Sequence, residues 1–269
     1  MREGLSLSEP MYVPSSEYAD EVVPNRPGRA FGGVAIGILL FGVAGYTFPP
    51  GSVENATSFA YPVHYRPVGA ASIANVVGTQ ANDAVLTELI EAARELEAQG
   101  CRAIIGACGY FANYQPQIRD AVDVPCFLSS LMQLPLILNS LPPRKKVAII
   151  CADGEVLPDS AALAHSGITD LSRLVIAGGR ISDIPELNDE ILVDSGGYNP
   201  KKLEREIVAV ARQMVDDDPD IGAFLLECTL FPPTSYAVQR AVGLPVFDFV
   251  TMIDWVQSAV VKRPFTGYI

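Results

Sequence analysis

The chain has 269 residues, of which 49% are hydrophobic and 19% charged, so it can bury a sizeable core and is not an intrinsically disordered protein. Its 19 basic and 31 acidic side chains give a formal charge of -12, which repels nucleic acid backbones and anionic membrane surfaces. Its 5 cysteines are an odd number without a Cys-x-x-Cys spacing, which favours free thiols over a disulfide framework.

The N-terminal segment 1–30 carries four prolines among polar residues and is predicted to be an arm over the surface. The apolar stretch from Phe31 to Ala44 is too short for a membrane helix, which needs about 20 residues, and is expected to form a buried strand. No basic start followed by an apolar run and a cleavage site precedes it, so no signal peptide is visible. We therefore expect a cytoplasmic protein.

From residue 34 onward, short apolar runs alternate with amphipathic segments. In the first half, strands are predicted at 34–41, 103–107 and 124–127, and helices at 83–99, 114–121 and 130–140. After a polar turn at 141–146, strands are predicted at 147–151, 174–177, 223–227 and 245–247, and helices at 160–165, 201–215, 234–241 and 251–261. This alternation predicts an α/β fold in which mainly parallel sheets are flanked by helices.

The two halves share a repeated sequence. An offset of 120 residues aligns 101–127 with 221–247 without a gap, and seven of the 27 positions are identical, among them Cys108 with Cys228. The similarity that any two α/β units share would not align a cysteine pair. We therefore predict two pseudo-symmetric α/β lobes with an active site in the cleft between them. The predicted parts are an arm at 1–30, a first lobe at 31–143, a second lobe at 144–261 and a C-terminal tail at 262–269.

Cys108 and Cys228 each follow an apolar strand and precede a helical segment. Ligands of open parallel sheets bind at the carboxyl ends of strands, so both sulfurs are expected to face a substrate from opposite walls of the cleft. Unpaired amides at the start of the next helix favour a thiolate and can also cradle a carboxylate. Two such thiols suit the inversion of a carbon acid next to a carboxylate, because one removes a proton from one face and the other returns a proton to the opposite face.

Cofactor chemistry finds little support in the sequence. The lysines all lie in polar turns or at helix starts, which disfavours a Schiff base with pyridoxal phosphate. The two histidines belong to no cluster with metal-ligand spacing, so no metal site is predicted. Acid/base chemistry by thiols without a cofactor is the prediction that remains.

The segments around the two cysteines carry a family resemblance. They read Gly106-Ala107-Cys108-Gly109-Tyr110-Phe111 and Leu226-Glu227-Cys228-Thr229, and Leu244-Pro245-Val246-Phe247-Asp248 follows the second. With the runs 48–51, 55–59, 61–63 and 129–131, they resemble the aspartate/glutamate/hydantoin racemase superfamily, and in particular a branch labelled "aspartate/glutamate racemase family". The resemblance extends over most of 34–261 and implies a two-lobed α/β fold, no cofactor, and Cys108 and Cys228 as the proton-transferring pair.

The sequence departs from glutamate racemases at the residues that follow the cysteines. Gly109-Tyr110 stands where those enzymes carry Asn-Thr, and Thr229-Leu230 stands where they carry Thr-His. Their acidic-Ser-Gly loop after the first strand is replaced by Gly42-Val43-Ala44-Gly45-Tyr46. Glutamate itself is therefore a poor substrate prediction. An algal-type dimethylsulfoniopropionate lyase of the same superfamily is similar around Cys108, with a Gly-Tyr/Phe-Phe continuation and a downstream Ser-Ser-Leu-x-Gln-Leu-Pro run.

Further residues are predicted to contact the substrate. They are Gly109, Tyr110 and Thr229 beside the cysteines, Tyr46, Thr47 and Asn55 in a long loop rich in glycine and proline, Ser129 after a strand, and Cys151 at the end of one. The plainer interpretations are loop structure for 46–55, a helix N-cap for Ser129 and a buried thiol for Cys151. Glu227 is interpreted as a buried carboxylate that alternates away from the neighbouring sulfur.

The leading hypothesis is a cofactor-independent racemase or epimerase of a small carboxylate, an amino acid or a derivative, that transfers protons between two cysteines. The alternative is a lyase or decarboxylase of the same superfamily, similar to the dimethylsulfoniopropionate lyase or to arylmalonate decarboxylase. A third hypothesis, a two-lobed binding protein of the periplasmic type, is disfavoured because no export signal is visible. The expected partner is a small carboxylate and not nucleic acid or membrane, and the sequence leaves a homo-oligomer open.

Overall fold

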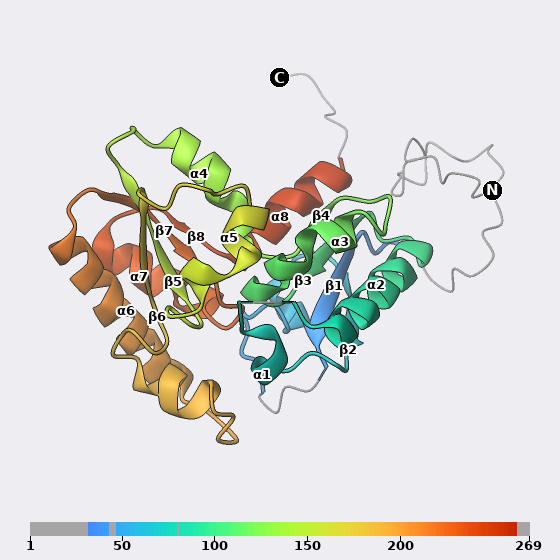
Figure 1. Ribbon diagram of the computed structural model, residues 1–269, viewed down its shortest axis with the longest axis horizontal. Coiled ribbons are helices and arrows are strands. Elements are labelled where there is room, and N and C mark those ends of the chain that lie inside the picture. The colour runs from blue at the N-terminus through green and yellow to red at the C-terminus, as the bar shows by residue number, and fades with distance from the viewer. Residues whose placement is uncertain (1–31, 43–46, 80, 263–269) are drawn as a thin grey trace, which may run out of the picture.

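The structure is a computed structural model that describes residues 32–42, 47–79 and 81–262. The predicted arm at 1–30, Tyr46 and residues 263–269 of the predicted tail lie outside this part of the chain. The described residues form two four-stranded sheets whose strands are all parallel, with helices packed around them (Figure 1). The predicted α/β fold is therefore confirmed.

The first sheet has the strand order β2-β1-β3-β4. Its strands are β1 (Ile36–Phe41), β2 (Val63–Val68), β3 (Ala103–Gly106) and β4 (Cys126–Phe127). The helices of this half are α1 (Ile73–Val76), α2 (Asp83–Ala98), α3 (Gln115–Arg119) and α4 (Leu134–Ser140). All of β3 is buried, as a central strand covered on both faces should be.

The second sheet has the order β6-β5-β7-β8, which is the order of the first sheet repeated. Its strands are β5 (Lys146–Cys151), β6 (Leu174–Gly178), β7 (Ile221–Leu226) and β8 (Val246–Phe247). The helices that follow in this half are α5 (Ala161–His165), a π-helix (Glu186–Ile191), α6 (Pro200–Asp217), α7 (Ser235–Val242) and α8 (Phe249–Val260).

The strand register carries the same offset as the repeated sequence. In the first sheet Ile105 of β3 pairs with Phe127 of β4, and in the second sheet Leu225 of β7 pairs with Phe247 of β8. Each residue of the second pair lies 120 positions after its counterpart in the first pair. The internal repeat is therefore a repeat of three-dimensional structure, and it places the residues after β3 and β7 at matching sites.

The longest helix of each half begins at an asparagine and buries one stripe of apolar side chains. Asn82 accepts hydrogen bonds from the amides of Ala84 and Val85 at the start of α2, and Asn199 accepts them from Lys201 and Lys202 at the start of α6. The buried stripes recur every three or four residues, as a helix packed on a sheet requires: Val85, Leu89, Ala92, Ala93 and Leu96 in α2, and Leu203, Ile207, Ala211 and Met214 in α6.

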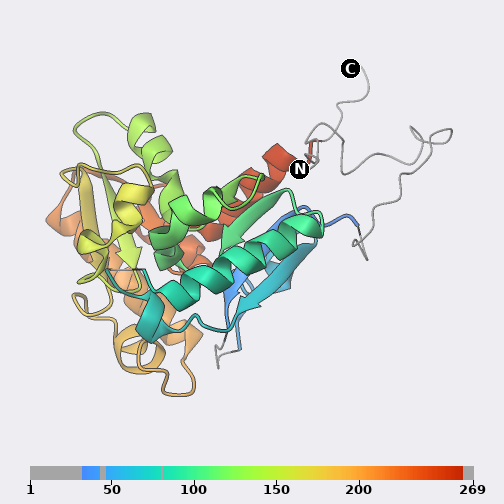
Figure 2. The ribbon, with the colours of Figure 1, turned by 45° about the vertical axis from the view of Figure 1, so that its right-hand side comes forward.

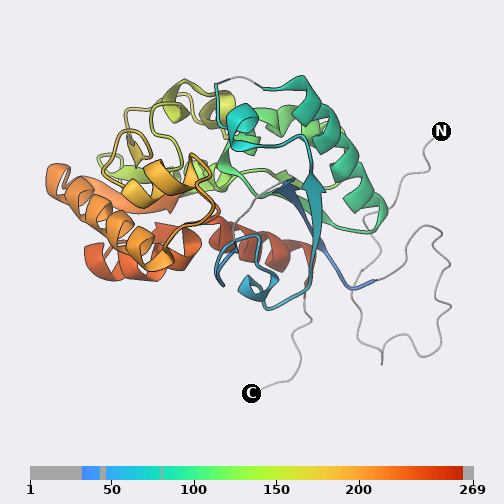
Figure 3. The same cartoon turned by 90° about the horizontal axis from the view of Figure 1, so that it is seen from below.

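The last helix, α8, crosses to the first sheet. Its buried residues Phe249, Met252 and Ile253 pack with Ile36 of β1 and Ile105 of β3. Seen from below, α8 lies between the two sheets and close to β1 (Figure 3), and the turned view shows α2 across the outer face of the first sheet (Figure 2). The predicted second lobe, 144–261, thus includes a helix whose apolar face covers the first sheet.

Several elements were not predicted from the sequence, among them β2, the short helix α1 and the π-helix. No strand was predicted where β2 lies, and it is an edge strand that contains Pro67, a residue that central strands exclude. The π-helix Glu186–Ile191 has no simple sequence signature. Among the described residues, no helix combines the length and the apolar character that a bilayer span requires.

Candidate active site

A cavity of about 680 Å³ opens where the carboxyl ends of the two sheets face each other. Both Cys108 and Cys228 line it, as do Gly109, Tyr110 and Thr229 beside them. Other parts of its wall come from the end of β1, from α1, from the π-helix and the residues after it, and from the loops that carry Glu54 and Arg180. The cavity thus gathers the residues after β3 and after β7, which is where ligands bind in open parallel sheets.

Cys108 follows β3 and starts the 3-10 helix Gly109–Tyr114. Its side chain is almost fully buried. Burial and the neighbouring carboxylate of Glu227 raise the pKa of the Cys108 thiol well above its ordinary value, although the amides of Tyr110 and Phe111 face the sulfur and act in the opposite direction. The predicted amides are therefore present, but they do not outweigh burial and charge, and the resting form is the thiol.

Cys228 lies at the matching site after β7 and is half-buried. The Phe231 amide donates to the Cys228 carbonyl at 3.0 Å, as the Phe111 amide donates to the Cys108 carbonyl at 3.0 Å, so the two turns share one backbone geometry. Burial and the carboxylate of Glu227 raise the pKa of the Cys228 thiol, whereas the hydrogen bond from the Leu230 amide lowers it. At both sites the amides favour the thiolate as expected, but burial and the charge of Glu227 outweigh them.

Glu227 extends from the end of β7 across the end of β5 to the first half. It is fully buried, and its Oε2 accepts a hydrogen bond from the amide of Ala152 at 3.0 Å. Its Oε1 lies over Gly109, where an added Cβ would come within 1.6 Å of that oxygen. Burial raises the pKa of Glu227 to about 7. The sequence suggested a buried carboxylate here, and the structure adds that it lines the cavity between the two cysteine turns.

Glu54 is a cavity residue that the sequence analysis did not identify. The Thr229 hydroxyl donates to Glu54 Oε1, and Oε2 is inaccessible to solvent with no hydrogen-bond partner among the described residues. Burial raises the pKa of Glu54 to about 7, and the hydrogen bond from Thr229 opposes this shift. An isolated glutamate in a loop gives no sequence signal. Glu54 and Thr229 are 175 positions apart in the chain, and only the fold brings them into contact.

Arg180 supplies a cation to the same cavity, and it too was missed. Its Nε lies 2.6 Å from Oδ2 of Asp153, a fully buried carboxylate. Asp153 also accepts, through its backbone carbonyl, the hydroxyl proton of Tyr110 at 2.6 Å. Arg180 has a left-handed backbone with φ of 67° and follows two glycines, which is a loop geometry that composition does not predict.

The remaining predicted contact residues do not line the cavity. Asn55 shapes its own loop: its side chain donates to the Phe48 carbonyl at 2.9 Å and accepts from the Thr57 amide at 2.9 Å. Ser129 accepts from the Leu131 amide at 3.2 Å as an N-cap, and Cys151 is fully buried with its thiol donating to the Ala177 carbonyl at 3.3 Å. Thr47 is exposed. Their roles as substrate contacts stay predictions.

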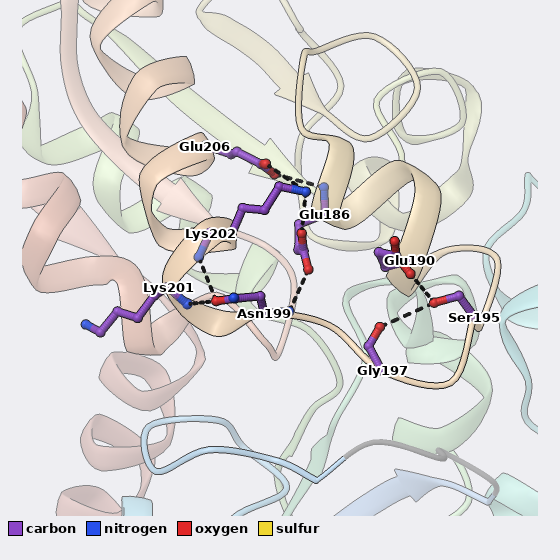
Figure 4. Close-up of polar contacts among 8 residues, drawn as sticks. All are labelled: Glu186, Glu190, Ser195, Gly197, Asn199, Lys201, Lys202 and Glu206. Carbon is purple, nitrogen blue, oxygen red and sulfur yellow. Dashed lines mark hydrogen bonds and ion pairs between the residues drawn. The ribbon is translucent and has the colours of Figure 1, made fainter.

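One wall of the cavity is a segment braced by polar contacts. Leu187, Ile191, Leu192, Val193 and Asp194 face the cavity from the π-helix and the residues after it. Glu186 anchors the start of this segment. It accepts a hydrogen bond from the Asn199 amide at 2.6 Å and forms an ion pair with Lys202 at 2.7 Å (Figure 4). The Ser195 hydroxyl donates to Glu190 within the turn that follows (Figure 4). The apolar wall is thus fixed from outside the cavity.

Several known proteins are similar to this chain in sequence. Dimethylsulfoniopropionate lyase 7 of Emiliania huxleyi is 33% identical over 232 residues, which is 82% of this chain and 67% of that protein. The chain spans 59% of the length of two further lyases of the same organism, numbered 3 and 6, which are both 32% identical. No protein-family model matches the chain.

Solved structures resemble the fold. An aspartate racemase homologue from Pyrococcus horikoshii has a TM-score of 0.55 at 18% identity, over 85% of this chain and 99% of that one. Unliganded arylmalonate decarboxylase has a TM-score of 0.52 at 18% identity, over 86% of this chain and 96% of that one. The predicted superfamily is confirmed by these two lines together: its enzymes share the fold, and lyases of a related branch share the sequence.

Proposed function

The chain belongs to the sequence family of the dimethylsulfoniopropionate lyases, within the aspartate/glutamate/hydantoin racemase superfamily, and we propose that it is a cysteine-dependent lyase of a small carboxylate that carries a sulfonium group. The observation that carries this proposal is the cavity itself, in which two thiols and the Glu54 carboxyl lie among apolar side chains. A racemase, the leading hypothesis from the sequence, has less support because the relatives similar in sequence are named as lyases.

In the proposed reaction, the thiolate of one cysteine takes a proton from the carbon next to the substrate carboxylate. The electron pair of that C–H bond forms a double bond to the neighbouring carbon, and the C–S bond breaks with its electrons going to sulfur. For dimethylsulfoniopropionate, the products are acrylate and neutral dimethyl sulfide, and the cysteine is left as a thiol. Because the sulfide leaves without taking a proton, this reaction needs only one base.

Glu54 and the aromatic ring beside it are the proposed seat of the sulfonium. A sulfonium cannot donate a hydrogen bond, so it is best held by a buried carboxylate and by aromatic faces. Glu54 offers Oε2 without a hydrogen-bond partner among the described residues, and Phe48 lines the same cavity. A bound cation would favour the ionised form of Glu54 and so lower its pKa from about 7.

The substrate carboxylate is proposed to lie toward Arg180, which lines the cavity. The Nε of Arg180 pairs with Asp153, and its positive charge favours a ligand carboxylate nearby. The Glu227 carboxyl fills the space over Gly109, so the substrate carboxylate is not placed at that position.

Cys228 is the proposed base. It is the more exposed of the two thiols, and Glu54 is one of the charges that raise its pKa. A sulfonium seated at Glu54 would therefore lie close to Cys228 and stabilise its thiolate when the substrate binds. Cys108 then has a supporting role on the opposite wall.

The direct test is to incubate the purified protein with dimethylsulfoniopropionate. Dimethyl sulfide and acrylate are expected in equal amounts, measured by gas chromatography of the headspace and by liquid chromatography of the solution. The C108S/C228S double variant is the matched control, because its cavity keeps the same shape without either thiol. Equal product release by the wild type and the double variant would overturn the proposal.

A second candidate function is racemisation of a small amino acid or derivative. It is favoured by one observation: thiols at matching positions of a structural repeat line the same cavity. The test is chiral chromatography of amino acids and hydantoins after incubation in deuterated water. Inversion with uptake of deuterium at the carbon next to the carboxylate, without release of a sulfide, would favour this candidate over the lyase.

A further inference from the structure

The Glu227 carboxyl occupies the space between the two cysteine turns. Its Oε2 accepts the Ala152 amide at 3.0 Å, at the end of β5. Its Oε1 rests on Gly109, the residue directly after Cys108, and it is buried without a hydrogen-bond partner among the described residues. Cys228 follows it in the chain. One carboxyl is thus in reach of both thiol-bearing turns, and one of its oxygens is uncommitted.

The groups that face Glu227 are mostly acidic. They are the thiols of Cys108, Cys151 and Cys228, the phenol of Tyr110, and the carboxylate of Asp153. The Tyr110 hydroxyl donates a hydrogen bond to the Asp153 carbonyl, and the Asp153 carboxylate pairs with Arg180. After burial, the charge of Glu227 is the largest influence on both Cys108 and Cys228. Because Tyr110, Asp153 and Arg180 interact with one another, the thiols of the cysteines are the groups whose protons Glu227 Oε1 can accept.

We propose that Glu227 is the shared proton acceptor of the two thiols, so that a thiolate forms at either cysteine by transfer of its proton to the Glu227 carboxylate. In this step the S–H bond breaks, an O–H bond forms on Glu227, and the negative charge moves from the carboxylate to sulfur. No charge enters or leaves the cavity. Glu227 acts through the cysteines and is a positioning residue for their protons.

Transfer of the thiol proton to Glu227 costs less free energy in this buried site than loss of that proton to solvent. Losing a proton to solvent would leave a thiolate beside a carboxylate in a poorly solvated cavity, and each charge disfavours the other. Moving the proton to Glu227 leaves a thiolate beside a neutral carboxylic acid, which can donate a hydrogen bond to it. The pair then titrates as one unit rather than as two separate groups.

This sharing has a signature in thiol reactivity that needs no substrate. Iodoacetamide reacts with the thiolate, so the rate of labelling at Cys108 follows the thiolate population. Below pH 7 that rate is expected to rise about tenfold per pH unit. Above pH 7 it is expected to level off, because Cys108 and Glu227 together have then lost one proton and the fraction of thiolate stays constant. In E227Q the rate is expected to keep rising to pH 9, where it exceeds the wild-type rate about 100-fold.

The measurement is peptide mass spectrometry of the wild type and its variants, labelled at pH 5.5 to 9. E54Q is the matched control, because Glu54 lies in the same cavity and is not among the main causes of the raised pKa of Cys108. The bend at Cys108 is expected to persist in E54Q. At Cys228, which also faces Glu54, the bend is expected to vanish in the E54Q/E227Q double variant.

Three results would overturn the inference: a wild-type profile at Cys108 without a bend between pH 6 and 8, a bend that survives in E227Q, or a bend that is lost in E54Q. The first needs no variant, so misfolding of E227Q cannot hide it. Because labelling is independent of catalysis, an absence of lyase activity would leave this result intact, and a failed bend would leave the lyase proposal intact.

Discussion

The two halves of the molecule build the same turn after the same strand and differ in the residues beside the sulfur. In both, a phenylalanine amide closes the turn onto the cysteine carbonyl at 3.0 Å. Before the sulfur the first half carries Ala107 and the second Glu227; after it they carry Gly109 and Thr229. The repeat thus supplies the position of each thiol, and residues that differ between the copies supply the charge. We expect a one-base lyase to use this asymmetry of charge and a two-base racemase to need two equivalent thiols.

Replacing each cysteine tests this asymmetry with the largest expected effect. C228S is expected to lower kcat/KM for sulfide elimination by a factor of about 10² to 10⁴, because a hydroxyl is too weak a base to replace the thiol. C108S is expected to lower it by about tenfold, the size of one lost supporting interaction. The measurement is headspace gas chromatography. Equal losses in the two variants would point to the symmetric two-base mechanism.

The difference between E227Q and the wild type in the dependence of stability on pH tests the charge of the second half. The folded protein holds the Glu227 proton up to about pH 7, whereas the unfolded chain releases it near 4.5, so the free energy of unfolding falls as pH rises between these values. The loss is on the order of 1–3 kcal/mol. E227Q cannot titrate and is expected to show a flatter dependence in urea unfolding at pH 4.5 to 7.5. Parallel curves for variant and wild type would contradict the raised pKa.

Alanine at the two matching positions after the cysteines sharpens the comparison. In G109A the new Cβ meets Glu227 Oε1 at 1.6 Å, and the forced shift is expected to cost about 2 kcal/mol of unfolding free energy. T229A only removes the hydrogen bond to Glu54 and is expected to cost about 1 kcal/mol. Urea unfolding of both variants gives the comparison. A G109A protein as stable as T229A would mean that Glu227 does not rest on Gly109.

Removing the charge of Glu54 is expected to change substrate binding and to leave the rest of the comparison unaltered. E54Q should raise KM for a sulfonium carboxylate about tenfold, because the cation loses its counter-charge, and should change kcat little. The inhibition constant of propionate, which lacks the cation, should not change. If inhibition by propionate weakened as much as KM rose, Glu54 would hold the shape of the cavity rather than the cation.

The sequence was sufficient to predict what depends on local pattern and repetition. Apolar runs followed by amphipathic segments predicted the strands and helices around Cys108 and Cys228, and the constant offset predicted matching turns. β2 was missed because an edge strand needs little apolar alternation and tolerates Pro67. The sequence also suggested that Ser129 caps the following helix, and in the structure its hydroxyl accepts a hydrogen bond from the Leu131 amide there.

The charged part of the site could not be predicted in the same way. Glu54 and Arg180 lie in irregular loops, and only the packing of both halves brings them to the thiols. The net direction of the thiol pKa shifts could not be predicted either, because the amides that lower these pKa values are visible in a sequence whereas burial and the approach of Glu227 are not. Side chains whose partners lie far along the chain need the fold before their chemistry can be stated.

The packing of α8 on the first sheet has a consequence for the order in which the chain acquires its structure during synthesis. Ile36 and Ile105 of the first half lie against Phe249 and Ile253 of the last helix. The ribosome makes residues 249–260 after all of the first half, so the first half keeps an apolar face open until that helix has been made. We therefore expect the first core to close only when α8 emerges and packs against it.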